Sequence, residues 1–252
     1  MPETRYFIEN FTSALRMLGK TPGGGILELR HGAGAFATGM PFAGENYALF
    51  DKCSSQEEAA RVLAFFEDRN LPFISMQLPE LRKEVSGALE NRGLSIRAEY
   101  IAMSIRISFS GREQDQHVKR VKDRSGEIAW AEAAWTGFGG ELPVPDSYNS
   151  FAAYLSSSPD NRLYYLEKEG VPLCSALLHS ADGSCGLYYF ATRPEARRQG
   201  LAARLMDSLA DHASHFSENM VLLATEMGAK MYKNYGFTGL MRVSVLSGSD
   251  DI

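Results

Sequence analysis

Residues 188–206 decide the fold, and they read Tyr188-Tyr-Phe-Ala-Thr-Arg-Pro-Glu-Ala-Arg-Arg-Gln-Gly-Leu-Ala-Ala-Arg-Leu-Met206. The stretch begins with an apolar run that is typical of a buried strand, and Pro194 then marks a loop. The apolar residues that follow recur at helical spacing. We therefore expect a strand over 186–192, a short loop, and a helix over about 198–214.

The first turn of this expected helix is suited to an anion. A helix N-terminus carries unpaired N–H groups and about half a positive charge, so small residues such as Gly200 and Ala202 let a phosphate approach the backbone. Arg197 and Arg198 add charged donors that suit a pyrophosphate. The stretch is neither a Walker A loop nor a dinucleotide-binding GxGxxG loop.

The pattern Pro194-x-x-Arg197-x-x-Gly200-x-Ala202, placed after a strand, resembles motif A of the GNAT N-acetyltransferase family. In that family the loop holds the pyrophosphate of acetyl-coenzyme A (acetyl-CoA), and a main-chain N–H of the preceding strand polarises the acetyl carbonyl. The resemblance implies that acetyl-CoA is bound by Phe190, Ala191, Thr192, Arg197, Arg198, Gln199, Gly200, Leu201, Ala202 and Ala203, with Thr225 and Tyr232 further along the chain. It also implies acetyl transfer by direct attack of an amine in a ternary complex.

A second segment, Ala229-Lys-Met-Tyr-Lys-Asn-Tyr-Gly-Phe237, resembles motif B of the same family. There a tyrosine near the coenzyme sulfur often protonates the departing thiolate, and Tyr232 matches it. A phenol can act in this way because it keeps its proton at neutral pH. Tyr235 is a weaker match by spacing, and we expect Gly236 to end the helix.

Two features depart from the family pattern. Thr225 stands where many members have an asparagine that contacts the coenzyme, and the strand Cys185–Thr192 has no acidic residue where many members have their general base. Glu226, at the end of the next expected strand, is a candidate base. The alternatives are Glu132, Glu141, His179 and a bound water.

The rest of the chain alternates strand and helix patterns, which predicts an α/β (α+β) fold with a mixed central sheet flanked by helices. We expect helices over 4–17, 54–70, 79–91, 126–137, 147–156, 198–214 and 227–234, and strands over 26–30, 34–39, 46–50, 72–77, 96–109, 118–121, 162–168, 171–179, 186–192, 219–224 and 238–246. The stretch 110–117 has no large apolar side chain and is interpreted as a linker between domains 1–109 and 118–252.

The two halves share a weak internal repeat at an offset of 143 residues. The pairs are Gln56 with Gln199, Ala59 with Ala202, Ala60 with Ala203, Arg61 with Arg204, Phe73 with Phe216, Asn91 with Asn234 and Gly93 with Gly236. The same offset places Glu57 opposite Gly200, Ser54 opposite Arg197 and Leu89 opposite Tyr232. We therefore expect two tandem GNAT copies, of which the first is degenerate, because a carboxylate would repel the pyrophosphate.

The acceptor site is expected within residues 128–156. Its aromatic side chains are Trp130, Trp135, Phe138, Tyr148, Phe151 and Tyr154, with Trp135, Phe138 and Tyr148 as candidate substrate contacts, and Glu132, Glu141 and Asp146 could hold a cation. A small or amino-acid-like amine is the first expectation, and a protein N-terminus or lysine is the second. The alternative function is a non-catalytic module that binds or senses acyl-CoA.

Composition excludes several other classes of protein. The 252 residues are 44% hydrophobic and 23% charged with a net charge of −5, which is typical of a globular protein and unlike a nucleic-acid binder. We expect no membrane segment, a cytoplasmic location, no metal, and free thiols at Cys53, Cys174 and Cys185, the last two buried. The sequence leaves the oligomeric state and the acyl chain length open.

Overall fold

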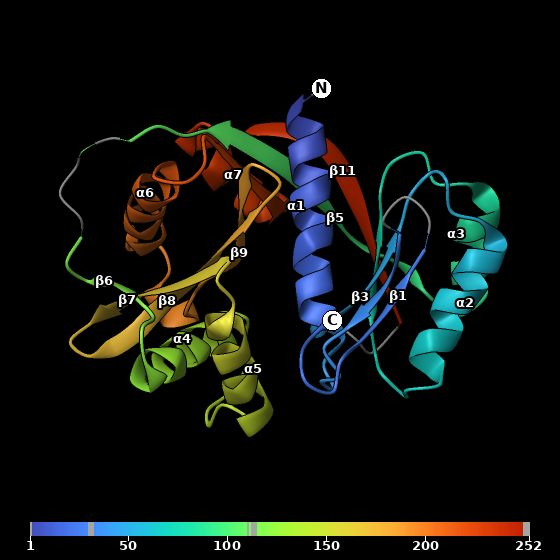
Figure 1. The fold of residues 1–252 in the computed structure, drawn as a ribbon, viewed down its shortest axis with the longest axis horizontal. Coiled ribbons are helices and arrows are strands. Elements are labelled where there is room, and N and C mark those ends of the chain that lie inside the picture. The colour runs from blue at the N-terminus through green and yellow to red at the C-terminus, as the bar shows by residue number, and fades with distance from the viewer. Residues whose placement is uncertain (1, 30–32, 110, 112–114, 249–252) are drawn as a thin grey trace. The chain divides into compact units, whose positions relative to one another are not determined.

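The computed structural model describes residues 2–29, 33–109, 111 and 115–248 (Figure 1). Its helices are α1 (Pro2–Gly19), α2 (Gln56–Glu67), α3 (Lys83–Glu90), α4 (Arg124–Gly137), α5 (Asp146–Ser157), α6 (Leu201–Ser214) and α7 (Glu226–Tyr235). Its strands are β1 (Gly25–Glu28), β2 (Gly34–Ala37), β3 (Asn46–Phe50), β4 (Ile74–Gln77), β5 (Ser95–Arg106), β6 (Val118–Arg120), β7 (Asn161–Lys168), β8 (Val171–Ala181), β9 (Ser184–Thr192), β10 (Asn219–Thr225) and β11 (Thr238–Ser247). The order of elements confirms the expected mixed α/β fold, although α3 and α6 begin later than predicted.

The chain divides into two compact units, and each unit is made of two separate stretches of the sequence. The first unit comprises the residues up to Asn10 together with Ser104–Leu222, and the second comprises Phe11–Met103 together with the residues from Leu223 onward. The boundaries fall inside α1, β5 and β10. The division into domains 1–109 and 118–252 stays a prediction, and residues 110 and 112–114 of the expected linker lie outside the described part of the chain.

The first unit is built on a sheet with the strand order β10-β9-β8-β7-β6. Strands β6 to β9 pair antiparallel, and β9 pairs parallel with β10 over Cys185–Leu187 and Met220–Leu222. Helices α4 and α6 cover opposite faces of this sheet (Figure 1). The face of α6 that contacts the sheet carries the buried residues Leu201, Leu205, Met206, Leu209 and Ala213, which is the spacing of an amphipathic helix.

A bulge interrupts β9 just before its end. The register with β8 shifts between Ser175 and Leu177, and Tyr189 has a positive φ of 48°. The Ser175 hydroxyl donates to the carbonyl oxygen of Tyr189 at 2.8 Å, which satisfies a backbone group at the irregular position. An extra residue bends a strand and turns its side chains, so the bulge sets how the last residues of β9 are presented.

A buried polar cluster ties the start of α1 to the sheet of the first unit. The Asn10 Nδ2 donates to the carbonyl oxygens of His179 at 3.1 Å and Ser184 at 3.2 Å, and its Oδ1 accepts from the Tyr188 hydroxyl at 2.8 Å. Gly186 is required beneath them, because a Cβ there would lie 2.0 Å from the Asn10 Oδ1. Burial raises the pKa of Tyr188, so its hydroxyl keeps the proton that it donates.

The second unit has its own sheet and core. Its strands follow the order β1-β2-β3-β4-β11-β5, with β3 and β4 parallel and β4 and β11 antiparallel. Helices α2 and α3 contribute the apolar side chains that pack on this sheet, and the core residues include Phe50, Val62, Leu63, Phe66, Val85 and Leu89. Helix α2 begins at Gln56, and Ser55 and Glu58 form a reciprocal capping box at its N-terminus.

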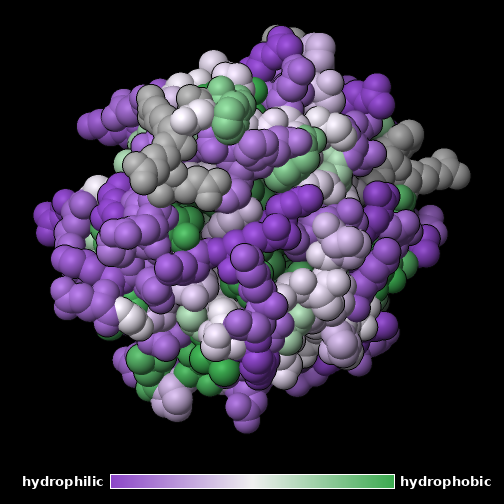
Figure 2. All heavy atoms as spheres, turned by 60° about the vertical axis from the view of Figure 1, so that its left-hand side comes forward, coloured by the Kyte–Doolittle hydropathy of each residue, from purple (hydrophilic) through white to green (hydrophobic). Residues whose placement is uncertain are grey.

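The face of the molecule drawn in Figure 2 is mainly polar. Figure 2 shows one face, where hydrophilic side chains dominate and hydrophobic ones are gathered in smaller patches. Within the described ranges, no helix is long and apolar enough to cross a membrane. The three cysteines are free thiols, with Cys174 and Cys185 buried as expected and Cys53 exposed. Burial raises the pKa of Cys185 to about 12, so this thiol is held in its unreactive protonated form.

Candidate functional site

The connection from β9 to α6 is a compact loop of the first unit. After Thr192 the chain makes a short 3₁₀ turn over Pro194–Ala196, and α6 begins only at Leu201 with Gly200 as its N-cap. The sequence-based start of α6 at Arg198 is therefore wrong. The reason is the backbone: Arg198 has φ 62° and Gly200 has φ 77°, and neither left-handed residue fits a right-handed helix.

This loop leaves the N-terminus of α6 accessible. Gly200 is exposed, and a Cβ placed on it would have no atom within 4 Å. The first intrahelical bond runs from the N–H of Arg204 to the Gly200 carbonyl, so the N–H groups of the preceding turn lie at the open end of the helix. Within the described part of the chain, α6 has no side-chain cap and no acidic residue in its first turn. The end of this helix is thus suited to an anion.

The two predicted anion-binding arginines lie in this loop. The Arg197 guanidinium donates from Nε to the carbonyl oxygen of Thr192 and from Nη2 to that of Gly137, each at 3.1 Å. Arg197 therefore links the residue that precedes the loop, Thr192, to the last turn of α4. Arg198 has an exposed side chain at the rim of the same turn.

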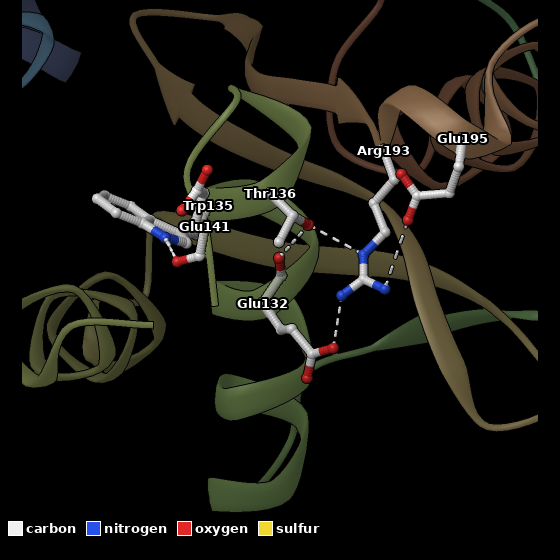
Figure 3. A network of polar contacts seen from close by, with 6 residues as sticks. All are labelled: Glu132, Trp135, Thr136, Glu141, Arg193 and Glu195. Atoms are coloured by element: carbon white, nitrogen blue, oxygen red, sulfur yellow. Dashed lines mark hydrogen bonds and ion pairs between the residues drawn. The ribbon is translucent and has the colours of Figure 1, made fainter. Parts of the chain in front are cut away.

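Sequence reasoning missed Arg193, which is only 7% exposed. Figure 3 shows its guanidinium pointing to α4, where Nε donates to the Thr136 hydroxyl at 2.9 Å and Nη2 contacts the Glu132 carboxylate at 2.5 Å. Glu195, within the loop, lies 3.9 Å from Nη1. An arginine in a charged stretch before a proline gives no sequence signal of burial, because such residues are normally exposed.

The predicted aromatic region is assembled around Tyr189, at the bulge of β9. The Tyr189 ring packs edge-on against Trp130, Phe138 and Phe151, with ring centroids 5.6, 6.3 and 5.8 Å apart. Phe138 is 63% exposed, whereas Trp130 and Phe151 are core residues. The cluster thus extends from the core of the first unit to its surface.

The other two candidate substrate contacts are less accessible than Phe138. The rings of Trp135 and Tyr148 lie 5.2 Å apart, and the Trp135 indole N–H donates to the Glu141 carbonyl oxygen at 2.7 Å (Figure 3). Tyr148 is only 2% exposed, so it belongs to the core. Trp135 is half-buried and keeps part of its ring at the surface.

Three more of the predicted coenzyme contacts end β9. Ala191 is buried against α4, because a Cβ on Gly137 would come within 2.7 Å of the Ala191 Cβ. The Thr192 hydroxyl lies 3.4 Å from the Cys174 sulfur. Phe190 is half-buried. A glycine in the last turn of α4 is therefore what allows the helix to approach the end of β9.

Three other predicted residues belong to the second unit and are placed by α7. The Thr225 hydroxyl accepts from the N–H of Gly228 at 3.1 Å, so Thr225 is the N-cap of this helix. Tyr232 is 8% exposed, and burial raises its pKa, which keeps the phenol protonated. Glu226 is exposed and lies 3.5 Å from Arg242. Gly236, with φ 117°, ends the helix as predicted.

The alternative bases differ in their surroundings. His179 is 3% exposed, its Nδ1 lies 2.7 Å from the Asn161 Oδ1, and burial lowers its pKa, so the ring is neutral at pH 7. Glu132 is ion-paired with Arg193, and Glu141 has an exposed side chain. Within the described residues, no group of three or more His, Cys, Asp or Glu side chains could hold a metal ion.

The match to a known family covers the residues that form the loop and α7. Residues 128–237 match the model of the acetyltransferase (GNAT) family. The matched stretch, which is less than half of the chain, is called the GNAT segment below. It includes the aromatic cluster, the Arg193 network, the loop before α6, and Tyr232. No curated protein matches the chain.

The fold outside the GNAT segment also has solved counterparts. A GCN5-related N-acetyltransferase from Kribbella flavida has a TM-score of 0.64 at 16% identity, covering 95% of this chain and 94% of that chain. A GCN5-related N-acetyltransferase from Sphaerobacter thermophilus has a TM-score of 0.58 at 13% identity, covering 85% and 75%. A functionally unknown protein from Staphylococcus epidermidis has a TM-score of 0.57 at 12% identity, covering 82% and 85%. These likenesses concern the fold, which extends over both sides of the GNAT segment.

Proposed function

We propose that this protein is an acetyl-CoA-dependent N-acetyltransferase that acts on a primary amine. The observation that carries the proposal is the open N-terminus of α6 within the GNAT segment, where Gly200 has nothing within 4 Å of its Cβ position. The first-turn N–H groups and Arg198 supply donors for the two negatively charged phosphates. Acetyl-CoA is here the acyl donor, and the reaction needs no metal.

The chemistry is direct transfer in a ternary complex. The neutral amine attacks the acetyl carbonyl carbon, the carbon–sulfur bond breaks, and the thiolate takes the proton of the Tyr232 phenol. Burial raises the pKa of Tyr232 and so keeps this proton on the oxygen at neutral pH, where it is available to the departing sulfur. A main-chain N–H of β9 near its bulge stabilises the charge on the carbonyl oxygen.

The acceptor ammonium gives one proton to a base or to water before it attacks as the neutral amine, and the second proton that its nitrogen loses on forming the amide restores the Tyr232 phenol. Glu226 stays our first candidate, since it is exposed and begins α7, the helix that carries Tyr232. Glu132 is a weaker candidate, because accepting a proton would break its 2.5 Å contact and leave the buried Arg193 charge without its partner. His179 is too deeply buried for an acceptor to reach it directly.

The first half of the chain is proposed to be a degenerate copy of the second. Both halves run strand, helix, strand, helix, strand, as β3-α2-β4-α3-β5 and β9-α6-β10-α7-β11, and both contain a parallel pair. The difference lies at the helix N-terminus. Ser55 and Glu58 already cap α2, and Glu57 adds a second carboxylate to its first turn. The N-terminus of α2 is thus unsuited to an anion, unlike that of α6.

The acceptor is proposed to bind beside the aromatic cluster around Tyr189. Phe138 presents an exposed ring, Trp135 a partly exposed one, and Glu141 an exposed carboxylate close to them in the chain. Aromatic faces and a carboxylate both attract an ammonium group. We therefore favour a small-molecule amine with an apolar portion over a protein amine.

Thiol release from acetyl-CoA in the presence of an amine panel tests this function. The panel contains aromatic and aliphatic amines, amino acids, and peptides with free N-termini or lysines. We expect release that depends on the amine and a product heavier by one acetyl group. Acetyl-CoA binding without release under any amine would support the alternative of a sensing module, and the absence of binding would reject both.

A further inference from the structure

Arg193 is the most thoroughly buried charge beside the loop. Its backbone is fixed as well as its side chain, because its N–H donates to the Leu173 carbonyl oxygen and its own carbonyl accepts from Ala196, each at 2.9 Å. Burying a guanidinium costs free energy unless its N–H donors are paired, so the partners on α4 are what allow Arg193 to be buried. We expect the loss of one of these contacts to change the conformation of the loop.

The contacts of this arginine belong to a larger set between α4 and the loop. Arg193 binds Glu132 and Thr136, Arg197 donates to the Gly137 carbonyl oxygen, and Gly137 approaches Ala191. All of them involve the last two turns of α4, and Figure 3 shows the contacts of Arg193 with Glu132 and Thr136. The left-handed residues Arg198 and Gly200 follow directly in the chain, so α4 determines where the open end of α6 begins.

We infer that Arg193 is a positioning residue for the anion loop, a role that rests on the proposed function. Through Glu132 and Thr136 it holds residues 197–200 in the conformation that points backbone donors at a pyrophosphate. Donors that are already in place bind an anion without the entropy loss of ordering the loop. Loss of the contacts of Arg193 with Glu132 and Thr136 therefore weakens binding of the phosphate part of the ligand. The same contacts keep α4, which carries the acceptor-side aromatic residues Trp135 and Phe138, in register with the coenzyme loop.

The test compares two probes that share one thiol arm, coenzyme A and pantetheine, of which only coenzyme A has the pyrophosphate. Affinities are measured by calorimetry on the full chain. The main variant is Arg193→Met with Glu132→Leu, because replacing both partners of a buried pair with apolar residues of similar size tends to preserve the fold. We expect the preference for coenzyme A over pantetheine to fall by about tenfold or more, as small misplacements of binding groups commonly cost.

Two further variants separate orientation from charge. Arg193→Lys keeps the charge but loses the forked geometry, and Glu132→Gln keeps the shape and one acceptor, so each should fall between wild type and the double variant. The matched control is Arg5→Met with Glu9→Leu, an exposed ion pair on α1 with a 2.7 Å contact, which should leave the preference unchanged.

Three results would contradict one or the other proposal. An unchanged preference in a folded double variant, or an equal loss of affinity for both probes, overturns the positioning role, because that role requires a selective loss for coenzyme A, the probe that carries the phosphates. If the wild type itself shows no preference for coenzyme A, the proposed function fails instead. Thermal unfolding of every variant establishes that the compared proteins are folded.

Discussion

Gly200→Glu is expected to weaken acetyl-CoA binding by at least about 100-fold. The substitution puts a carboxylate at the open end of α6, as the first half of the chain has at Glu57. Two like charges about 4 Å apart near a protein surface repel by about 4 kcal/mol, which exceeds the roughly 2.7 kcal/mol that corresponds to 100-fold. Calorimetric titration of acetyl-CoA measures the change.

The control for Gly200→Glu is Gly200→Gln. Gly200 has φ 77°, a backbone conformation that costs a non-glycine residue about 1 kcal/mol, and both variants suffer this strain equally. Only the glutamate adds charge, so the glutamine variant should retain most of the affinity that the strain leaves. Equal affinities in the two variants would show that no anion binds at this helix end.

Tyr232→Phe is expected to lower kcat by about 100-fold or more, while the Kd for acetyl-CoA stays within about threefold. A positioned general acid typically contributes 10²–10⁴-fold, and the lost hydroxyl is required only when the thiolate departs. Burial raises the pKa of Tyr232 above the ordinary tyrosine value of about 10. The active protonated form therefore persists at every pH below that ordinary value. The wild-type rate should therefore show no loss from this group as the pH rises to about 9.

Tyr235→Phe provides the matched control for Tyr232→Phe. Tyr235 lies on the same helix, its ring is 6.2 Å from that of Phe237, and it is more exposed than Tyr232. Steady-state kinetics should show near wild-type kcat for this variant. A loss of kcat in Tyr235→Phe with normal turnover in Tyr232→Phe would reverse the assignment of the acid, and normal turnover in both would remove a phenolic acid from the mechanism.

Local patterns predicted most elements because each is specified by nearby residues. The capping box of α2 is formed by Ser55 and Glu58, which are three residues apart, and the apolar patterns of β7 to β9 predict these strands. The end of α7 at Gly236 follows from the freedom of glycine at positive φ. These features needed no knowledge of distant contacts.

The features that the sequence did not reveal depend on contacts between distant segments. The start of α6 is set by left-handed backbone at Arg198, an uncommon conformation for arginine, beside a loop fixed from α4. The burial of Arg193 depends on Glu132 and Thr136, about 60 residues earlier in the chain. The bulge at Tyr189 arises from the register of two strands and not from either alone.

Local sequence patterns also did not predict that each unit is made of two separate stretches of the chain. Asn10 lies in the middle of an amphipathic helix, and only the structure shows its side chain bonded to His179, Ser184 and Tyr188. Likewise β11, at the end of the chain, pairs with β4 of the first half. Periodicity predicts such helices and strands correctly but does not identify the segments with which they pair.

The most direct test of the account is the number of acetyl-CoA molecules that bind to one wild-type chain. Of these two corresponding helices, α6 begins at Gly200 without a side-chain cap, whereas α2 is capped by Ser55 and Glu58 with Glu57 beside them. We therefore predict a single site per chain in a calorimetric titration. Two sites of comparable affinity, or none, would contradict the account.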